Sequence, residues 1–182
     1  RFYSENRVWV DYDELPESYI EAVIAIEDKS FWKHEGIDLY GLVRAIVVNY
    51  TTDRTEGAST ITQQLSRNLL IDAEERFSQK LSRKIQEALI ALNIEEVMSK
   101  QEIFTYYSNV IYFGQSAYGI DAAAHKFFGK ELQDLTLEEC ATLAGLPQSP
   151  INKDPVNFMD KAVIRRNAVL TAMYDDGYIT EE

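Results

Sequence analysis

Two adjacent acids, Glu27 and Asp28, end an apolar run and stand just before two large aromatic residues, Phe31 and Trp32. A carboxylate that packs against aromatic rings is partly desolvated, which disfavours its charged form and makes it a better proton acceptor near neutral pH. Glu27 is therefore the candidate general base. The alternative is a solvated helix end with an Asp28–Lys29 surface pair, and it stays open because charged residues are mostly exposed.

A second candidate feature is a group of cations within an acidic chain. Residues 57–84 carry five basic and three acidic side chains, a net charge of +2, so the rest of the chain carries −14. Such a group indicates a local anion site, for which arginine offers bidentate contacts to phosphate. The alternative is a set of i,i+4 pairs, such as Arg83–Glu87, on a solvated helix face. The five cations are Arg67, Arg76, Lys80, Arg83 and Lys84.

The stretch GASTITQQ, residues 57–64, places uncharged donors at an expected helix start. Donors in this position suit sugar hydroxyls or phosphate oxygens. A capped helix whose glutamines face water explains the same pattern equally well.

The two histidines, His34 and His125, are far apart in the sequence. Each is expected to be structural, His34 because Glu27 already offers a base. A dedicated zinc or iron site is not expected from two separated histidines and one cysteine, Cys140. A single cysteine also cannot form an internal disulfide.

Helix signals dominate the elements that must position these residues. Pro16 suits a helix start, and capping-box spacing at Ser99–Glu102 and Thr136–Glu139 marks two more. Only residues 7–12 alternate convincingly as a strand. The expected class is mainly α, in one domain. Helices are predicted over 16–27, 39–50, 57–70, 76–98, 99–109, from 136 onward, and over 158–175.

The helix over 76–98 is apolar on two sides. Its polar side carries Arg83, Lys84 and Glu87, which are expected to face a cleft, and later positions on that side are apolar too. We therefore expect the helix to be buried. The apolar stripe on the other side is formed by Leu81, Ile85, Ala88, Leu89 and Leu92.

Composition limits the functional classes. The chain has 182 residues, 46% hydrophobic and 26% charged, which is typical of an ordered globular domain. The net charge of −12 argues against nucleic acid as a partner. No apolar run approaches the roughly 18 residues of a membrane span. The chain begins at Arg1, which indicates a domain excised from a longer protein, with any N-terminal anchor outside it.

Five stretches, in order, resemble the motifs of the peptidoglycan glycosyltransferase family, which comprises the glycosyltransferase domain of class A penicillin-binding proteins and the monofunctional transglycosylases. They are EDKSFWKHEG, GASTITQQLSRN, RKIQE, KQEIFTYYSNVIYFG and LTLEECATLAGLPQSP, and they extend over nearly all of residues 1–182. One such motif is weak, but five in the family's order are specific.

The resemblance implies a lysozyme-like, two-lobed, mainly helical domain with a small membrane-associated lobe at about 38–56. It implies polymerisation of lipid II into β-1,4 glycan strands on the extracytoplasmic face of the bacterial cell membrane. The acceptor 4-hydroxyl attacks the MurNAc anomeric carbon with inversion, and undecaprenyl pyrophosphate leaves. The implied partners are lipid II, the lipid-linked glycan, the membrane surface and moenomycin-type inhibitors. The apolar LYGLVRAIVVNY, residues 39–50, would rest in the lipid interface.

The resemblance also implies roles for individual residues. Glu27 matches the catalytic base, and Glu87 the second essential carboxylate, which holds cations in place. The implied substrate-binding residues are Ser59, Thr60, Gln63, Gln64, Arg67, Asn68, Arg83, Lys84 and Lys100. The implied supporting residues are Asp28, Phe31, His34, Gly57, Tyr107 and Asn109.

Other readings remain. The main alternative is a lysozyme-like glycan-cleaving enzyme, which also needs a carboxylate in a cleft, and a second is a silent lipid-pyrophosphate binding module. No cofactor is required by the sequence, although some family members are stimulated by Mg or Mn. Departures from the usual family residues occur at Arg67 (lysine), Ser108 (leucine), Cys140 (alanine) and Lys153 (tyrosine), and none removes a proposed catalytic group.

Overall fold

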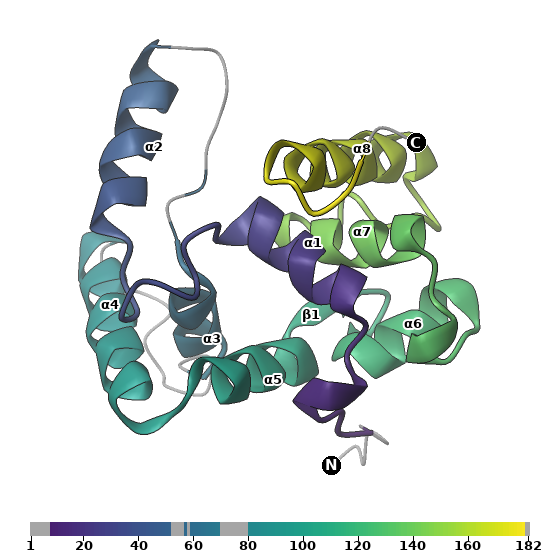
Figure 1. The fold of residues 1–182 in the computed structure, drawn as a ribbon, viewed down its shortest axis with the longest axis horizontal. Helices are drawn as coiled ribbons and strands as arrows, with labels where there is room; N and C mark the ends of the chain where they lie inside the picture. Colours follow the sequence, from purple (N-terminus) through teal and green to yellow (C-terminus); the bar gives the residue numbers. More distant parts are fainter. Residues whose placement is uncertain (1–7, 52–56, 58, 70–79, 181–182) are drawn as a thin grey trace. The chain divides into compact units, whose positions relative to one another are not determined.

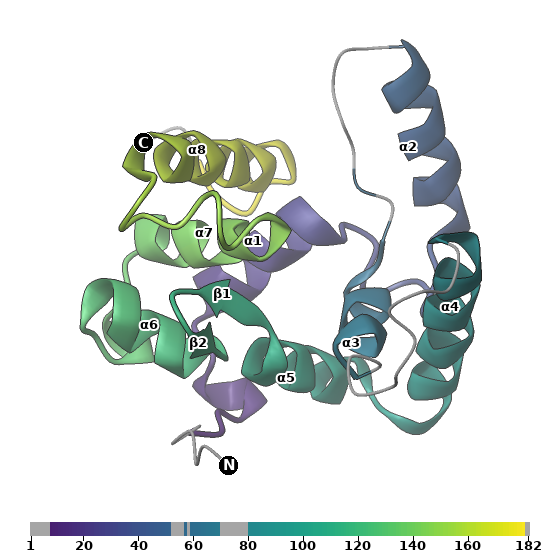
Figure 2. The ribbon, with the colours of Figure 1, turned by 180° about the vertical axis from the view of Figure 1, so that it is seen from behind.

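A computed structural model describes residues 8–51, 57, 59–69 and 80–180, and it is mainly helical, as expected (Figures 1 and 2). The chain divides into two compact units. One is formed by residues 27–107, and the other by residues 1–26 together with 108–182. We describe each unit by itself.

The unit of residues 27–107 holds every predicted site residue except Asn109. Its helices are α2 (Leu39–Thr51), α3 (Ile61–Leu69), α4 (Lys80–Val97) and most of α5 (Lys100–Val110). The α3 and α4 helices lie side by side, and buried Ser66 joins them by donating to the backbone oxygen of Glu87 at 3.0 Å. Every one of these helices lies at a predicted position, although α3 begins four residues later than expected.

The other unit is also helical around one short hairpin. Its elements are a 3₁₀ turn η1 (Tyr12–Glu14), α1 (Glu17–Glu27), strands β1 (Tyr112–Gly114) and β2 (Ala117–Tyr118), α6 (Ile120–Phe128), η3 (Leu132–Asp134), α7 (Leu137–Gly145), η4 (Leu146–Gln148) and α8 (Met159–Asp175). Strands β1 and β2 pair antiparallel. Thr136 and Glu139 form the predicted capping box of α7, whose Leu143 is buried, as are Val169 and Met173 on α8.

The prediction of a strand at 7–12 was wrong. Residues 8–11 form no strand, and residue 7 lies outside the described residues. The side chain of Asn109 takes the place of a partner strand, because its amide accepts from the Val10 N–H at 2.9 Å and donates to the Val10 carbonyl at 2.8 Å. Only Val10 of this stretch is buried, whereas Val8 and Trp9 are exposed.

The prediction of burial for α4 was wrong for its apolar stripe. Ile85, Leu89 and Leu92 are exposed, and the side chain of Leu81 is outside the described residues. The buried side instead carries Glu87, Ala91 and Ile94. This side is buried because Glu87 forms ion pairs there and because Gly36 lies close to the backbone of Ala91.

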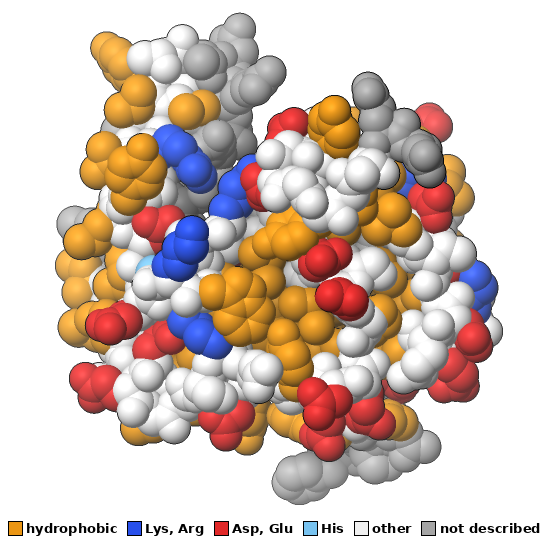
Figure 3. Space-filling view, viewed as in Figure 1, with side chains coloured by type: hydrophobic (Ala, Val, Ile, Leu, Met, Phe, Trp, Pro, Cys, Tyr) orange, Lys and Arg blue, Asp and Glu red, His pale blue; other side chains and the backbone are white. Residues whose placement is uncertain are grey.

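Exposed apolar side chains also cover α2. They are Leu39, Tyr40, Leu42, Val43, Val47 and Tyr50, and hydrophobic groups are prominent over this helix and along the edge of α4 (Figure 3). No helix in the described part of the chain is long and apolar enough to cross a membrane. The small lobe at about 38–56 stays a prediction, and residues 52–56 of it lie outside the described residues.

Candidate active site

Helix α3 begins with a reciprocal cap built from two predicted substrate-binding residues. The Gln63 N–H donates to the Thr60 hydroxyl at 3.1 Å, and the Thr60 N–H donates to the Gln63 side chain at 3.0 Å. This is the capping-box arrangement, with glutamine at its third position. The Thr60 hydroxyl also donates to the Gly36 carbonyl at 2.7 Å. Thr60 and Gln63 therefore fix the helix start, which favours the cap alternative for them.

The Asp28 carboxylate accepts a hydrogen bond from the next backbone N–H of α3. Its Oδ2 accepts the Ile61 N–H at 2.9 Å, and the Asp28 side chain is almost fully buried. A carboxylate is favoured at a helix N-terminus, where the helix dipole is positive. Asp28 thus ties the loop after α1 to α3 and fixes the residue next to Glu27.

Glu27 lies at the end of α1 and receives a hydrogen bond from α3. The Gln64 amide donates to Glu27 Oε2 at 2.8 Å. The donor is a neutral amide, so this contact orients the carboxylate without adding a positive charge. Glu27 is partly exposed, as a base that meets a substrate hydroxyl must be.

The Glu87 carboxylate is fully buried and lies among three cations. Lys84 Nζ lies 2.6 Å from Oε2, Arg67 Nε 3.0 Å from Oε1, and Arg83 Nε 3.5 Å from Oε1. The cation side chains are 44% exposed at Arg67, 53% at Arg83 and 45% at Lys84. We call these four residues the Glu87 cluster. Its cationic groups reach solvent while its anion does not.

Burial and hydrogen bonding act on Glu87 in opposite directions. Burial raises the pKa of Glu87, but hydrogen bonds from Lys84 and Arg67, together with their charges, outweigh it and hold the pKa of Glu87 below its usual value. Glu87 is therefore ionised at neutral pH. Its charge holds the cations together, which is the part the family resemblance implies for it.

One side of α3 brings the two proposed catalytic carboxylates into a single arrangement. Gln64 contacts Glu27 and Arg67 contacts Glu87. Residues three apart on a helix lie about 5–6 Å from each other on the same face. The base candidate and the cation group are thus neighbours along α3. Lys84 also donates to Ser59 at 3.1 Å, which adds a hydroxyl to this region.

His34 is held in one tautomer. The Gly36 N–H donates to Nδ1 at 3.0 Å, so Nδ1 is an acceptor and Nε2 carries the ring proton. Nε2 lies 2.8 Å from Asp28 Oδ2 and donates to it. His34 therefore supports Asp28, which agrees with the structural part expected for this histidine.

Lys100 belongs to a separate group of charges, which we call the Glu95 cluster. Its Nζ lies 2.7 Å from Glu95 Oε1, 3.5 Å from His34 Nδ1 and 4.7 Å from the centroid of the Phe31 ring. Thr62 donates to the same Glu95 oxygen at 2.6 Å. The structure thus brings Arg67, Arg83 and Lys84 together on Glu87, and it places Lys100 on Glu95.

The remaining predicted residues have mainly structural surroundings. Asn68 is partly exposed on α3 and donates to the Gln64 carbonyl at 3.1 Å. Gly57 is exposed, and no atom of the described part of the chain would lie within 4 Å of a Cβ there. Phe31 and Tyr107 are fully buried and both lie beside the Phe104 ring. Arg76 lies outside the described residues, as does the side chain of Lys80. The substrate contacts of all these residues stay predictions.

Sequence reasoning missed Gly36 and Glu95. Gly36 has φ +90°, and a Cβ there would lie 2.9 Å from the Ala91 backbone carbonyl. A glycine at the end of a motif loop was a usable signal for such a conformation. Glu95 lies eight residues after Glu87, a little over two helical turns further along α4, and its contact with Lys100 is evident only from the structure.

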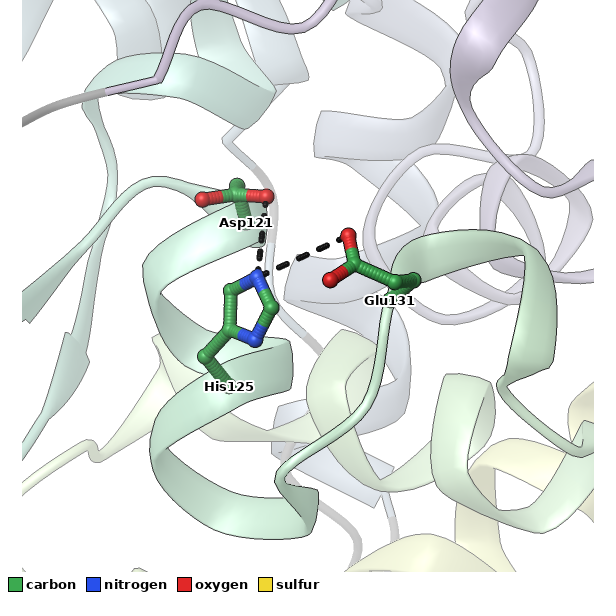
Figure 4. Close-up of side chains that lie close together, drawn as sticks. All are labelled: Asp121, His125 and Glu131. Atoms are coloured by element: carbon green, nitrogen blue, oxygen red, sulfur yellow. Dashed lines mark ion pairs between the residues drawn. The ribbon is translucent and has the colours of Figure 1, made fainter.

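A third group of titratable residues lies in the other unit, on α6 and just after it. His125 Nε2 is 3.6 Å from Asp121 Oδ1 and 3.8 Å from Glu131 Oε2 (Figure 4). The three donor atoms lie within 4.8 Å of one another, close enough to hold a metal ion. His125 and Glu131 are exposed, and exposed groups of this kind are common without a metal. The expectation that no metal is required stays a prediction.

Comparison with known proteins identifies the family of this chain. Residues 1–174 match a family model described as Transglycosylase. Penicillin-binding protein 1A from Aquifex aeolicus is 46% identical over 98% of this chain, and the Escherichia coli protein of that name is 45% identical over the same share. The chain spans 24% and 21% of these relatives, respectively.

A solved structure gives the same result. The crystal structure of penicillin-binding protein 1A from Haemophilus influenzae matches with a TM-score of 0.56 and 26% identity, over 96% of this chain and 16% of that one. The family match covers well over half of the chain, and the fold and the order of the motifs agree with it. The chain therefore belongs to the transglycosylase family.

Proposed function

We propose that this domain is a peptidoglycan glycosyltransferase that polymerises lipid II into β-1,4 glycan strands. The observation that carries the proposal is the pairing, along α3, of a partly exposed carboxylate with a cation group anchored on a buried one. The names of the matched family and relatives support the same activity.

In the proposed reaction Glu27 acts as the general base. It takes the proton of the GlcNAc 4-hydroxyl on the acceptor, lipid II, and the resulting oxygen attacks the anomeric carbon of MurNAc on the lipid-linked glycan. The bond to undecaprenyl pyrophosphate breaks with its electron pair, and the configuration inverts from α to β. A positioned base contributes roughly 10²–10⁴-fold to the rate. Gln64 keeps the Glu27 carboxylate oriented.

The Glu87 cluster has the charge that the leaving group needs. Three cations around one carboxylate leave two positive charges uncompensated within the cluster, on side chains that are about half exposed. A departing pyrophosphate gains negative charge in the transition state, and preorganised cations stabilise that charge. Arg67 and Arg83 can also make bidentate contacts to phosphate oxygens. In this proposal Glu87 fixes the cations and does not touch the reacting atoms.

The domain is proposed to work at the extracytoplasmic face of the bacterial cell membrane. The exposed apolar residues of α2, including Tyr40, Val43 and Tyr50, suit a lipid interface. A lipid-linked substrate would then reach the site without leaving the membrane. Moenomycin-type inhibitors are proposed to compete for the same site. No bound metal is required in this proposal, because the cations of the Glu87 cluster provide the positive charge.

The test is Glu27→Gln in a lipid II polymerisation assay. The glutamine keeps the size of the side chain but cannot accept the proton, so turnover is expected to fall at least about 100-fold. Glu35→Gln, an exposed neutral substitution on the following loop, is the matched control and should retain wild-type turnover. Retention of more than about a tenth of wild-type turnover by Glu27→Gln contradicts the assigned base, given the scale of general-base effects.

Two further measurements separate the alternatives. Incubation with preformed peptidoglycan is expected to release no fragments, and release would favour glycan cleavage. A silent binding module would bind lipid II yet form no polymer, with or without Glu27→Gln. Hydrolysis of an uncharged glycosidic bond gives no reason for Arg67, Arg83 and Lys84 to converge, so the cation group favours the polymerase.

A further inference from the structure

The proposed reaction makes no use of one group of titratable side chains, which is formed by Asp121, His125 and Glu131 (Figure 4). All three lie in the unit of residues 1–26 and 108–182, whereas Glu27 and Glu87 lie in the other unit. One imidazole nitrogen and two carboxylate oxygens are ligands that a divalent ion such as zinc accepts in proteins. We call these three residues the His125 group.

The donor atoms of the His125 group have the spacing of metal ligands. His125 Nε2 lies 3.6 Å from Asp121 Oδ1 and 3.8 Å from Glu131 Oε2. Both distances exceed the roughly 2.7–3.2 Å of an N–H···O hydrogen bond. Ligand atoms held about 2.1 Å from a tetrahedral ion lie roughly 3.4 Å from one another. The three atoms, all within 4.8 Å of one another, are therefore better placed around one ion than for direct hydrogen bonds.

The other histidine of the chain shows a contrasting arrangement. His34 Nε2 lies 2.8 Å from Asp28 Oδ2, and its Nδ1 accepts from the Gly36 N–H at 3.0 Å. Both ring nitrogens are thus engaged by the protein, and the side chain is only 6% exposed. The side chain of His125 is 45% exposed, and its Nε2 is at hydrogen-bond distance from neither acid. An ion in solution can therefore reach His125 but not His34.

Helix α6 positions two of the three ligands. Asp121 and His125 are four residues apart, so they lie one turn from each other on the same face of the helix. Ala123 and Ala124 are fully buried, which holds α6 against the rest of its unit. The two donor atoms are therefore placed by a packed helix, and binding an ion requires little ordering of the backbone.

The turn after α6 positions the third ligand. Gly129 ends the helix in the left-handed conformation, with φ +64°, and its N–H donates to the His125 carbonyl at 3.0 Å. Such a cap turns the chain away from the helix axis. Lys130 forms an ion pair with α7, and Leu132 is buried, so the backbone is anchored on both sides of Glu131. The Glu131 side chain is 71% exposed and can adjust its rotamer to an ion.

We propose that Asp121, His125 and Glu131 bind one divalent transition-metal ion, for which zinc is the best-suited candidate, and that the ion joins the end of α6 to η3. Three protein ligands leave at least one coordination position to water. The ion takes no part in the proposed glycosyltransferase reaction, so the two proposals stand independently. The sequence expectation of no zinc site counted histidines and a cysteine, but here two carboxylates complete the ligand set.

The first test is a calorimetric titration of the metal-free chain, without a histidine tag, with zinc chloride at pH 7.5. We expect saturable binding of one ion per chain. Asp121→Asn, His125→Gln and Glu131→Gln should each weaken the affinity at least about tenfold, because loss of even an outer partner of a metal ligand has an effect of that size. If the wild type shows no saturable binding, or His125→Gln binds zinc as tightly as the wild type, the proposal is overturned.

The matched control is Asp134→Asn, which removes an exposed acid from η3, three residues after Glu131. It removes the same charge as Asp121→Asn but no proposed ligand, so it should keep the wild-type affinity. If Asp134→Asn weakens zinc binding as strongly as Asp121→Asn does, the ion is attracted by the general acidity of this surface, and the specific site is wrong.

The second test identifies the kind of ion. Magnesium prefers six oxygen ligands, so magnesium chloride at the same concentration should not displace zinc. Cobalt(II) takes the same ligands as zinc and should give a visible absorption band with the wild type that His125→Gln lacks. Displacement of zinc by equal magnesium, or an unchanged cobalt spectrum in His125→Gln, would contradict a site that includes the imidazole.

The third test measures stability. Zinc that joins α6 to η3 binds the folded chain, so a free concentration about ten times the dissociation constant should raise the Tm by roughly 3–6 °C. The same zinc concentration should leave the Tm of His125→Gln unchanged, and Asp134→Asn should respond as the wild type does. An equal rise in His125→Gln and the wild type would refute the proposed link.

Discussion

The Glu87 and Glu95 clusters are built from the same side of one helix but are suited to different tasks. Both place a largely buried carboxylate of α4 against α3, Glu87 with Arg67 and Glu95 with Thr62. The cations of the first cluster are about half exposed, and the lysine of the second is mostly buried. The exposure of the cation, and not the identity of the acid, separates a cluster whose cations can reach a ligand from one whose lysine faces the interior of the unit.

The largest expected effect is at the first cluster. Glu87→Gln leaves three cations without their shared anion, so they spread apart and no longer converge on a leaving group. Turnover in the lipid II assay should fall at least about 100-fold, the size typical of losing preorganised charge stabilisation.

Stability should also fall in Glu87→Gln. Breaking a buried pair costs about 3–5 kcal/mol, and the half-exposed cations reduce this to about 2–3 kcal/mol in urea unfolding. Glu95→Gln is the matched change at the second cluster. If it impairs turnover as strongly as Glu87→Gln does, the proposed difference between the two clusters is wrong.

The next largest effect concerns Gly36, which lies in the loop between Asp28 and α2. The Gly36 carbonyl accepts from the Thr60 hydroxyl at the start of α3. In Gly36→Ala, a new Cβ would meet the Ala91 backbone at 2.9 Å, at a φ of +90° that side chains rarely adopt. We expect a loss of about 2–4 kcal/mol in the free energy of unfolding, measured by urea denaturation. Gly57→Ala is the control, because no atom of the described residues lies within 4 Å of a Cβ there. Equal losses in the two variants would contradict the described loop.

A smaller effect appears in the dependence of stability on pH. The pKa of Glu87 is lowered in the folded state, so its ion pairs contribute stability above the ordinary glutamate value of about 4.3 and lose it as the pH falls through the lower folded value. Glu87→Gln should therefore flatten the acid limb of a stability–pH curve relative to the wild type. A limb of unchanged slope would show that the cluster does not stabilise the ionised acid.

The smallest expected effect concerns a buried polar group outside the two clusters. Ser108 is fully buried, and its hydroxyl has no hydrogen-bond partner among the described residues. Removing an unpaired buried hydroxyl is neutral or stabilising, so Ser108→Ala should change the free energy of unfolding by between zero and about +1 kcal/mol. A loss above about 1 kcal/mol in thermal or urea unfolding would mean that the hydroxyl has a partner.

Local signals in the sequence predicted much of the fold. Capping spacing placed the start of α7 at Thr136 and of α5 at Ser99, where both backbone and side chain of Ser99 bond to Glu102. The failures came from tertiary contacts. Residues 8–11 alternate like a strand, but Asn109, 99 residues from Val10, takes the place of a partner strand. The hairpin of β1 and β2 is too short to produce a periodic signal.

The sequence predicted a set of site residues, whose roles stay predictions, but it did not predict their geometry. The five motifs named Glu27, Glu87 and the cations, yet hydrophobic periodicity pointed to the wrong side of α4. Periodicity cannot anticipate that an ionised Glu87 is buried while Ile85 and Leu89 are exposed, because the ion pairs that compensate burial come from distant residues such as Arg67. The family resemblance likewise grouped Lys100 with the phosphate-binding cations, whereas its partner Glu95 is evident only in three dimensions.

The start of α3 has a consequence for product release. Its first backbone donors are engaged by the protein's own Asp28 and by the Thr60–Gln63 cap, so they cannot form a rigid phosphate cradle. In the proposed function, a diphosphate would instead be held by the ends of long side chains that water can reach. Such a grip adapts to a group whose shape changes during bond breakage and loosens easily afterwards. In the proposed reaction, a weak hold of this kind would help the domain to discard one lipid carrier for every sugar pair added.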